Sequence, residues 1–245
     1  MIYTDLLTTD KDPMGAAILD YLEHGRADKL RVFSSQFDED KIPVRTLFRT
    51  EKQVAPLERT ALQLATGRIL DVGAGSGCHS LALQAAGKEV EAIDISPLSV
   101  EAMRRRGVKQ ATQANLFNES FCGSYDTLLM LMNGSGIIGR LENLPAFFRK
   151  AKQLLRPGGS ILMDSSDLRY LYEDEDGSFV IDIAGDYYGE VDFRMQYKDI
   201  IGNPFDWLYI DFQTLSLYAA QNGFEAELVK EGKHYDYLAR LRPKA

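Results

Sequence analysis

The stretch from Arg68 to Gly77 reads RILDVGAGSG and places glycine at positions 73, 75 and 77, directly after four residues with the pattern of a buried strand. Glycine adopts positive φ angles without penalty and lets the backbone approach a ligand closely. A helix that starts just after such a loop offers unpaired N–H groups to a polar or anionic ligand. A glycine-rich turn can also serve only to pack a strand against a helix. Other features of the chain therefore have to separate these two interpretations.

Strand-like and helix-like segments alternate regularly from Gly67 onward. The last of the expected helices is the best marked, because apolar residues recur along it at helical spacing. Such alternation is typical of a parallel sheet that helices cover on both faces. The expected strands are 69–72, 90–93, 109–112, 127–132 and 161–164, and the expected helices are 78–86, 97–106 and 143–155.

The segments on either side of this alternation follow other patterns. Before it, DPMGAAILDYLEHG predicts a helix that Asp12 caps and Gly25 ends. The runs 190–197 and 205–210, separated by IGNP, predict a β-hairpin. The two final strand-like runs have a link so short that they are expected to be antiparallel. The remaining expected elements are an irregular stretch from 29 to 50, helices at 54–65 and 212–222, and strands at 224–230 and 235–241.

Composition narrows the possible partners. A formal net charge of −8 and a pI near 5.0 argue against a nucleic-acid backbone as the main partner, since phosphate binding requires a cationic surface. The two cysteines, Cys78 and Cys122, lack the paired spacing of a metal site or a disulfide framework. Neither a signal peptide nor an apolar stretch long enough to cross a bilayer is evident. We therefore expect a cytoplasmic protein without a metal site and without a nucleic-acid or membrane partner.

Three further features strengthen the ligand-binding interpretation of the glycine loop. Asp71 lies inside the strand that precedes the loop, where a dinucleotide-binding strand normally keeps an apolar residue. Asp94 ends the next strand and is positioned to accept hydrogen bonds from two ribose hydroxyls. The segment LRPGGSILMD, residues 155–164, joins a helix to a buried strand through a Pro-Gly-Gly turn.

Together these motifs resemble the class I S-adenosylmethionine-dependent methyltransferases. The resemblance rests on LDVGAGSG (70–77), VEAIDIS (90–96), YDTLLMLMN (125–133) and LLRPGGSILMD (154–164). It covers most of the chain from about Val54 onward. It implies a Rossmann-like, doubly wound, mostly parallel seven-stranded sheet with an antiparallel last strand. It divides the chain into an N-terminal helical cap segment, 1–53, and a methyltransferase domain, 54–245, with a β-hairpin insertion at about 173–211 as a substrate lid.

The resemblance also implies a set of cofactor-binding residues. Asp71 and the glycine loop would hold the methionine end of S-adenosylmethionine, and Asp94 would bind the ribose with Ile95 beside the adenine. Asn115 stands where the family usually has an acidic residue that faces the adenine amino group, and Asn133 would lie nearest the transferable methyl group. The full set is Asp71, Gly73, Ala74, Gly75, Gly77, Asp94, Ile95, Asn115, Leu116 and Asn133.

Other classes of nucleotide-binding enzyme, and other branches of this family, match the motifs of the sequence less well. A nicotinamide enzyme requires G-x-G-x-x-G, whereas the third position after Gly75 is Cys78. The sequence MNGSG at 132–136 replaces the Asn-Pro-Pro-Tyr motif of the branches that methylate amino groups in DNA and protein glutamine. With the acidic pI, a small-molecule acceptor becomes the default. An aminopropyl-transferring relative, to which the acidic run 173–176 gives slight support, and a non-catalytic cofactor-binding module remain alternatives.

Methyl transfer from a sulfonium is an in-line displacement, for which the protein mainly supplies binding, alignment and exclusion of water. Such an enzyme can lack a fixed catalytic constellation, and the sequence leaves its catalytic residue unknown. The candidates are Asn133, Asp164 and His79. For His79, which begins the helix after the glycine loop, contact with the cofactor or a neighbouring loop is the favoured role. Asp164 contacts substrate or caps a helix with the serines after it.

The remaining histidines and the aromatic residues have simpler interpretations. His24 ends the first helix, where a cation suits the helix dipole, and His234 is expected to be a solvated residue of the last hairpin turn. Packing of the hairpin explains at least half of the aromatic residues in the insertion. The others would form the roof of the substrate pocket together with Phe33, Phe37 and Phe48 of the N-terminal segment. The aromatic residues of the insertion are Tyr187, Tyr188, Tyr197, Trp207 and Tyr209.

Overall fold

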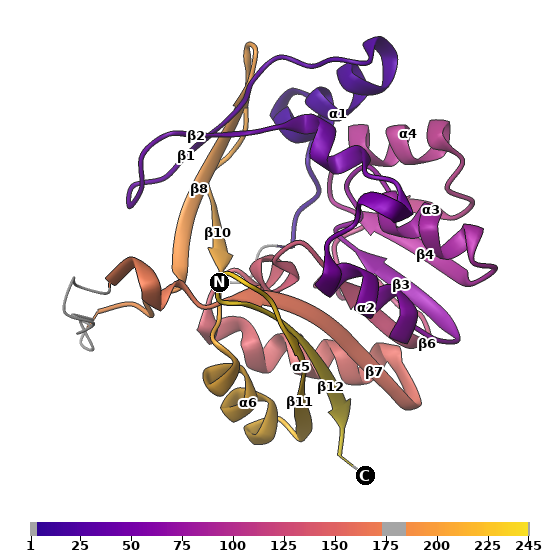
Figure 1. Ribbon diagram of the computed structural model, residues 1–245, viewed down its shortest axis with the longest axis vertical. Coiled ribbons are helices and arrows are strands. Elements are labelled where there is room, and N and C mark those ends of the chain that lie inside the picture. Colours follow the sequence, from indigo (N-terminus) through magenta and orange to yellow (C-terminus); the bar gives the residue numbers. More distant parts are fainter. Residues whose placement is uncertain (1–3, 173–184, 245) are drawn as a thin grey trace.

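The structure, a computed structural model, describes residues 4–172 and 185–244. Its larger part is a seven-stranded sheet with the strand order β11-β12-β7-β6-β3-β4-β5 (Figure 1). The strands β3 to β7 run parallel to their neighbours, whereas β12 is antiparallel to both β7 and β11. The expected mostly parallel sheet with an antiparallel last strand is thus confirmed. The strands are β3 (Arg68–Val72), β4 (Glu89–Asp94), β5 (Ala111–Gln113), β6 (Tyr125–Met130), β7 (Leu155–Ser166), β11 (Phe224–Glu231) and β12 (Asp236–Pro243).

Helices cover both faces of this core sheet, because neighbouring strand residues point in opposite directions. Ile69 of β3 packs in a cluster with residues of α2 and α3, whereas Leu70 packs with residues of α5 and α6. Figure 1 shows α2, α3 and α4 on one side of the sheet and α5 and α6 on the other. These helices are α2 (Pro56–Leu64), α3 (Cys78–Ala85), α4 (Pro97–Arg106), α5 (Leu144–Leu154) and α6 (Phe212–Gln221).

Two strand boundaries differ from the expected ones for identifiable reasons. The apolar run TLLMLM suggests a strand to residue 132, but β6 ends at Met130 because Met132 has a φ of 67°, outside the extended region. β7 begins at Leu155 and not at 161, because Leu155 already pairs with Tyr125 of β6, before an irregularity in the register that ends at Ser160. Both differences lie at the ends of strands, where side-chain periodicity carries little information.

The N-terminal segment contains the expected helix α1 (Pro13–His24), capped by Asp12 and ended by Gly25 in the left-handed conformation. The stretch from 29 to 50, expected to be irregular, instead includes β1 (Leu30–Phe33) and β2 (Asp40–Ile42). These short strands pair with each other and β1 also pairs with β8, far along the chain. Because β8 is so distant in the chain, no local sequence pattern predicted β1 and β2.

The insertion forms the expected antiparallel hairpin from β8 (Glu190–Tyr197) and β10 (Phe205–Leu208), with β9 (Ile200–Ile201) paired to β8. With β1 and β2 it makes a five-stranded small sheet in the order β10-β8-β1-β2. The acidic run 173–176 lies outside the described residues. Among the helices that the structure describes, none combines the length and apolar character needed to cross a bilayer. The short 3-10 helices are η1 (Thr9–Lys11), η2 (Val44–Phe48), η3 (Glu51–Gln53), η4 (Gly134–Ile138), η5 (Leu141–Asn143) and η6 (Leu168–Tyr172).

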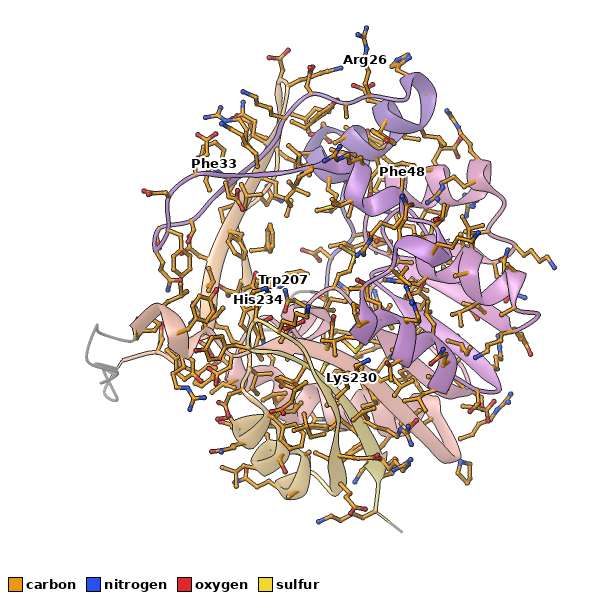
Figure 2. All side chains as sticks on the ribbon, in the orientation of Figure 1. Arg26, Phe33, Phe48, Trp207, Lys230 and His234 are labelled. Carbon is orange, nitrogen blue, oxygen red and sulfur yellow. The ribbon has the colours of Figure 1, made fainter. Side chains whose placement is uncertain are left out.

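The small sheet meets the core sheet at Trp207 of β10, which lies near the centre of the view in Figure 2. The indole packs directly on Gly136 of η4: a Cβ atom added at Gly136 would come within 1.8 Å of the ring atom Cε2. Glycine at this position therefore lets the two sheets approach each other just beyond the carboxyl end of β6.

Candidate active site

The glycine loop between β3 and α3 has an open backbone at its centre. Gly73, Gly75 and Gly77 have φ angles of 68°, 55° and 80°, so all three use the left-handed region that favours glycine. A Cβ atom added at Gly75 would meet no atom within 4 Å, whereas one at Gly77 would collide with Met103 and Val108. The loop is thus packed at its end and exposed in the middle, where a ligand can approach the backbone.

Asp94, at the carboxyl end of β4, connects this loop to the next one. Its Oδ2 accepts a hydrogen bond from the amide of Gly75 at 2.8 Å, and its Oδ1 accepts one from the amide of Ser96 at 2.9 Å. Burial raises the pKa of Asp94 to about 6, although the two amides oppose this shift. Each oxygen keeps a second acceptor position, so the carboxylate can bind further donors.

Asp71 lies beneath the loop. Its buried side chain accepts a hydrogen bond from the hydroxyl of Ser80 at 2.6 Å and so holds the first turn of α3 against β3. Burial raises the pKa of this carboxyl. The structure therefore gives Asp71 a positioning role for the helix that follows the loop, and its expected part in cofactor binding stays a prediction.

A buried network of charged side chains lies next to the glycine loop. Glu58 of α2 accepts from Arg49 at 2.7 Å, and its second oxygen lies 2.6 Å from Nε2 of His79, with both Glu58 and His79 only 5% exposed. Burial alone would lower the pKa of His79, but the hydrogen bonds to Cys78 and Glu58 raise it well above the usual value. Burial alone would raise the pKa of Glu58, whereas His79 and Arg49 lower it. Both partners of the pair are therefore charged near neutral pH.

This network changes the interpretation of two residues. His79 lies next to the loop, as the sequence predicts, but its ring is engaged by Glu58. Arg49 was not singled out from the sequence, because it lies in a charged stretch without a recognisable pattern. In the structure its Nε and Nη2 atoms are buried and have no hydrogen-bond partner among the described residues. A guanidinium with two unused buried donors is a signal for a missing anionic partner.

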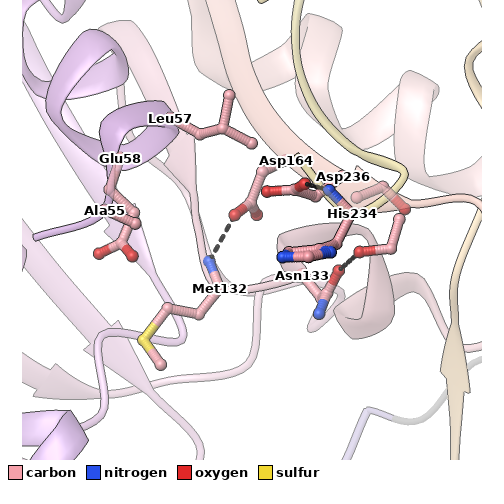
Figure 3. A pocket seen from close by; sticks show the side chains of 10 residues that line it. Ala55, Leu57, Glu58, Met132, Asn133, Asp164, His234 and Asp236 are labelled. Atoms are coloured by element: carbon pink, nitrogen blue, oxygen red, sulfur yellow. Dashed lines mark hydrogen bonds between the residues drawn. The ribbon is translucent and has the colours of Figure 1, made fainter. Parts of the chain in front are cut away.

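The turn after β6 is held in an unusual conformation. Met132 and Asn133 are consecutive non-glycine residues with φ angles of 67° and 56°, and such conformations persist where the surroundings impose them. Asp164 of β7 supplies that constraint, since its two oxygens accept from the amides of Met132 at 3.0 Å and of Gly134 at 2.9 Å. Figure 3 shows Asp164 aimed at this turn. Asp164 therefore holds this turn in place, and burial raises its pKa to about 6.

A pocket of about 360 Å³ lies beside this turn. His234, in the β11–β12 turn, reaches over it in Figure 3, with its amide donating to Asp236 at 2.9 Å. His234 is exposed, as the sequence predicts, but it also lines the pocket, which only the fold could reveal. In the part of the chain that the structure describes, this lining contains three carboxylates and neither lysine nor arginine. It consists of Ala55, Leu57, Glu58, Met132, Asn133, Asp164, Ser165, Ser166, His234 and Asp236.

Three of the tyrosines in the insertion have structural partners. The hydroxyls of Tyr187 and Tyr188 lie 2.7 Å from Asp211 and 2.8 Å from Asp167, and that of Tyr197 lies 2.7 Å from Asp20 of α1. These contacts fit the packing role favoured for at least half of the aromatic residues. Whether the others cover the substrate pocket stays a prediction.

The remaining sequence-predicted residues lie at the ends of β4 and β5. Ile95 follows β4, while Asn115 and Leu116 follow β5, and Asn115 and Leu116 are buried. The N-terminal stretch, residues 5–7, reaches this corner, where the amide of Leu7 donates to the carbonyl of Ile95 at 3.0 Å. The structure thus brings together the residues expected around the adenine and adds a segment that the sequence did not associate with them.

Comparisons with known proteins agree with this geometry. Residues 45–227 match a family model described as a methyltransferase domain. A crystal structure of an S-adenosylmethionine-dependent methyltransferase from Bacteroides fragilis, in complex with S-adenosyl-L-homocysteine, is 74% identical, covers 99% of both chains and has a TM-score of 0.94. The chain therefore belongs to the class I S-adenosylmethionine-dependent methyltransferases, and it is an enzyme of that family.

Curated relatives are more distant. The ubiquinone biosynthesis O-methyltransferase of Xanthomonas euvesicatoria is 31% identical over 43% of this chain and 46% of its own length. The cypemycin N-terminal methyltransferase of a Streptomyces species is 28% identical over 40% of this chain and 42% of its own length. This chain thus spans about half the length of the curated relatives it matches. The methyltransferase CcbJ of Streptomyces caelestis, 16% identical with a TM-score of 0.63 over 96% of this chain and 99% of its own, shares the fold.

Proposed function

We propose that this enzyme transfers a methyl group from S-adenosylmethionine to a small-molecule acceptor by in-line displacement. The observation that carries the proposal is the open backbone at Gly75, joined through its amide to the carboxylate of Asp94. An exposed glycine backbone beside an acceptor-rich carboxylate suits a ligand with a polar tail and a ribose. The B. fragilis relative, solved with S-adenosyl-L-homocysteine, supports the same assignment.

In this proposal different residues contact different parts of the cofactor. Asp94 accepts hydrogen bonds from the ribose hydroxyls, the loop from Gly73 to Gly77 with Asp71 lies along the methionine, and the segments after β4 and β5 surround the adenine. Asn133 lies nearest the methyl group. The sulfonium supplies the electrophilic methyl group when it is bound, so the chain has to align the acceptor and exclude water.

Arg49 fits the carboxylate of the methionine. Its two unused buried donors match a planar anionic partner, and Glu58 keeps the guanidinium oriented from the other side. This also separates methyl transfer from aminopropyl transfer, because the decarboxylated cofactor of an aminopropyltransferase would leave those donors unused. We therefore favour the methyltransferase over the aminopropyl-transferring alternative.

The pocket beside Asp164 is the proposed acceptor site. Its volume suits a small molecule. Arg49 and His79 balance the charge of Glu58, but Asp164 and Asp236 face no lysine or arginine among the described lining residues, which favours a neutral or cationic acceptor over an anionic one. Among the described lining residues His234 has the side chain best suited to take a proton from the acceptor, because histidine is the side chain that most often acts as a general base. The acidic protein surface agrees with an acceptor that is not a nucleic acid.

Calorimetry with S-adenosyl-L-homocysteine tests the cofactor part of the proposal. We expect a dissociation constant in the low-micromolar range or tighter, about −8 kcal/mol. Asp94→Ala removes the ribose acceptor and should weaken binding about 100-fold. Glu89→Ala, at the exposed opposite end of the same strand, is the matched control and should bind as wild type. Absence of binding by the wild type, or equal binding by Asp94→Ala, would contradict the proposal.

A labelling experiment tests the acceptor part. The enzyme is incubated with methyl-labelled S-adenosylmethionine and a metabolite extract, and labelled products are separated by charge. We expect neutral or cationic products, and we expect His234→Ala to lower kcat for methylation of the acceptor while Lys233→Ala leaves kcat unchanged. Labelling confined to anionic products would contradict the acceptor class, and absence of any label transfer would support the non-catalytic alternative.

A further inference from the structure

We propose that the N-terminal stretch Asp5–Leu7 forms one wall of the adenine subsite and that Asn115 acts by holding this stretch in place. The inference rests on the proposed cofactor site, because it concerns the adenine end of that site. It differs from the expectation that Asn115 contacts the adenine amino group directly. We call residues 5–7 the strap.

The strap is fastened to the carboxyl end of β4. The amide of Leu7 donates to the carbonyl of Ile95 at 3.0 Å. The side-chain amide of Gln113, the last residue of β5, donates to the carbonyl of Leu7 at 2.9 Å and to that of Ile95 at 3.0 Å. These bonds tie the strap to the residue expected beside the adenine.

Asn115 fastens the other end of the strap. Its Nδ2 donates to the carbonyl of Asp5 at 3.1 Å, while its Oδ1 accepts from the amide of Phe117 at 2.9 Å. The residue is only 5% exposed. A carboxylate could accept from Phe117 but could not donate to Asp5, because an ionised carboxylate has no proton to give. The strap therefore accounts for an asparagine where the family usually has an acidic residue.

A second anchor follows the strap in the chain. Asp12 is fully buried and accepts from the amides of Gly15 at 2.9 Å and Leu98 at 3.1 Å and from the hydroxyl of Ser96. It thereby fixes the start of α1 to the start of α4. In Figure 1 the indigo stretch before α1 descends from this helix toward the core sheet. The strap is thus held at both ends and is not a loose extension.

The anchors define where the strap lies relative to the ligand. It joins Ile95 to Asn115, the two positions that border the adenine in the proposed cofactor site. Leu6, between the two fastened residues, keeps 42% of its surface exposed. An exposed leucine at this position offers apolar surface for an adenine ring to cover. The strap therefore contributes contacts to the adenine, and Asn115 contributes through the strap.

Two substitutions of the same residue separate this role from direct contact. Asn115→Ala and Asn115→Asp both remove the donor to Asp5, whereas Asn115→Asp keeps an acceptor for the adenine amino group. We expect both to weaken binding of S-adenosyl-L-homocysteine equally, by about tenfold. Both substitutions should also weaken the binding of 5′-methylthioadenosine, which lacks the amino-acid part of the cofactor, by the same factor. Wild-type affinity, or a gain, for Asn115→Asp would overturn the inference in favour of direct contact.

A deletion tests the coupling between Asn115 and the strap. Removing residues 1–7 from the wild type should cause a similar loss of affinity, and removing them from Asn115→Ala should add nothing, since residues that act through one contact are non-additive. Fully additive losses would overturn the inference. Thr112→Ala, at an exposed position on β5, is the control and should bind as wild type. Gln113→Ala provides a second way to loosen the strap if an Asn115 variant fails to fold.

The outcome also separates this inference from the proposed function. If the wild type binds neither S-adenosylmethionine nor its product, the proposed function fails and the strap has no ligand. If the wild type binds and the Asn115 variants and the deletion bind equally well, only the strap inference fails.

Discussion

The core and the small sheet both contain ion pairs between side chains, but these pairs differ greatly in how deeply they are buried. In the core, Glu58 and His79 form an ion pair that is almost completely buried. At the small sheet, Arg31 of β1 and Glu39, just before β2, form a bidentate pair at 2.7 and 2.8 Å, and these side chains are 40% and 34% exposed. Breaking a buried pair leaves an uncompensated charge in a poorly solvated place, whereas water replaces the partner at the surface.

The two sheets also differ in how their strands find each other. Four of the six pairings in the core sheet join strands that follow one another in the chain, and only β3–β6 and β7–β12 join more distant ones. In the small sheet β1 pairs with β8, with Arg31 opposite Gln196, 165 residues away. The core thus holds the buried ion pair and mostly local strand pairings, whereas the small sheet holds a partly exposed pair and depends on a distant strand pairing. The following measurements test this difference.

The largest expected effect is on the buried pair. Glu58→Gln keeps the shape of the side chain but leaves the charges of Arg49 and His79 without their anion. We expect the free energy of unfolding to fall by about 3 kcal/mol, measured by urea denaturation of the unliganded protein. An unchanged unfolding free energy would show that the core network is no stronger than a surface pair.

The pH dependence of this effect has a defined sign. The lowered pKa of Glu58 contributes stability that is present above its unfolded value of 4.5 and is lost as the pH falls through the folded value. The raised pKa of His79 contributes stability that is fully present below 6.5 and is lost as the pH rises through the folded value. The difference between wild type and Glu58→Gln should therefore be largest between pH 4.5 and 6.5. A difference that grows steadily toward alkaline pH would contradict this assignment.

A smaller effect is expected where the two sheets meet. Gly136→Ala places a methyl group inside the indole of Trp207, so the small sheet has to shift. We expect a loss of about 2 kcal/mol from overpacking. Trp207 is the only tryptophan in the chain, so its fluorescence reports on this junction directly. A smaller partner in the double variant Gly136→Ala/Trp207→Leu should recover part of the loss, and purely additive losses would contradict the steric explanation.

The affinity for S-adenosyl-L-homocysteine should depend on pH through Asp94. Burial raises the pKa of this carboxyl from 3.8 to about 6, so the ionised form costs folding free energy above about pH 6, and the cost disappears below 3.8. The ribose needs the ionised form as an acceptor. We expect the dissociation constant to rise about tenfold between pH 7 and pH 5. Asp94→Asn should flatten the profile, and a flat wild-type profile would refute the role of Asp94.

The smallest effect is expected in the small sheet. Glu39→Gln is the same chemical change as Glu58→Gln, but it removes a charge from a pair that water already solvates. We expect no change in the free energy of unfolding beyond measurement error. A loss comparable to that of Glu58→Gln would remove the distinction between the two sheets.

Local patterns were sufficient to predict much of this molecule. The alternation of strands and helices, the glycine loop and the caps Asp12 and Gly25 depend on neighbours a few residues apart, and the structure contains them close to the expected positions. The family and its cofactor followed from motifs of the same local kind. The five parallel strands and the two helices nearest the site could be predicted without knowledge of distant contacts. Each strand–helix unit carries its own hydrophobic pattern.

The sequence by itself thus determined the class of fold, the family and its cofactor. Only the tertiary structure decided what individual polar groups do there: that Arg49 has donors to spare, that Asp164 holds the turn at Asn133, and that Asn115 is tied to the strap. It also decided that residues 30–33 are a strand. The physical reason is the same in each case. Hydrogen bonds and ion pairs join residues that the chain separates by tens of positions, and no periodicity in the sequence encodes such a partner.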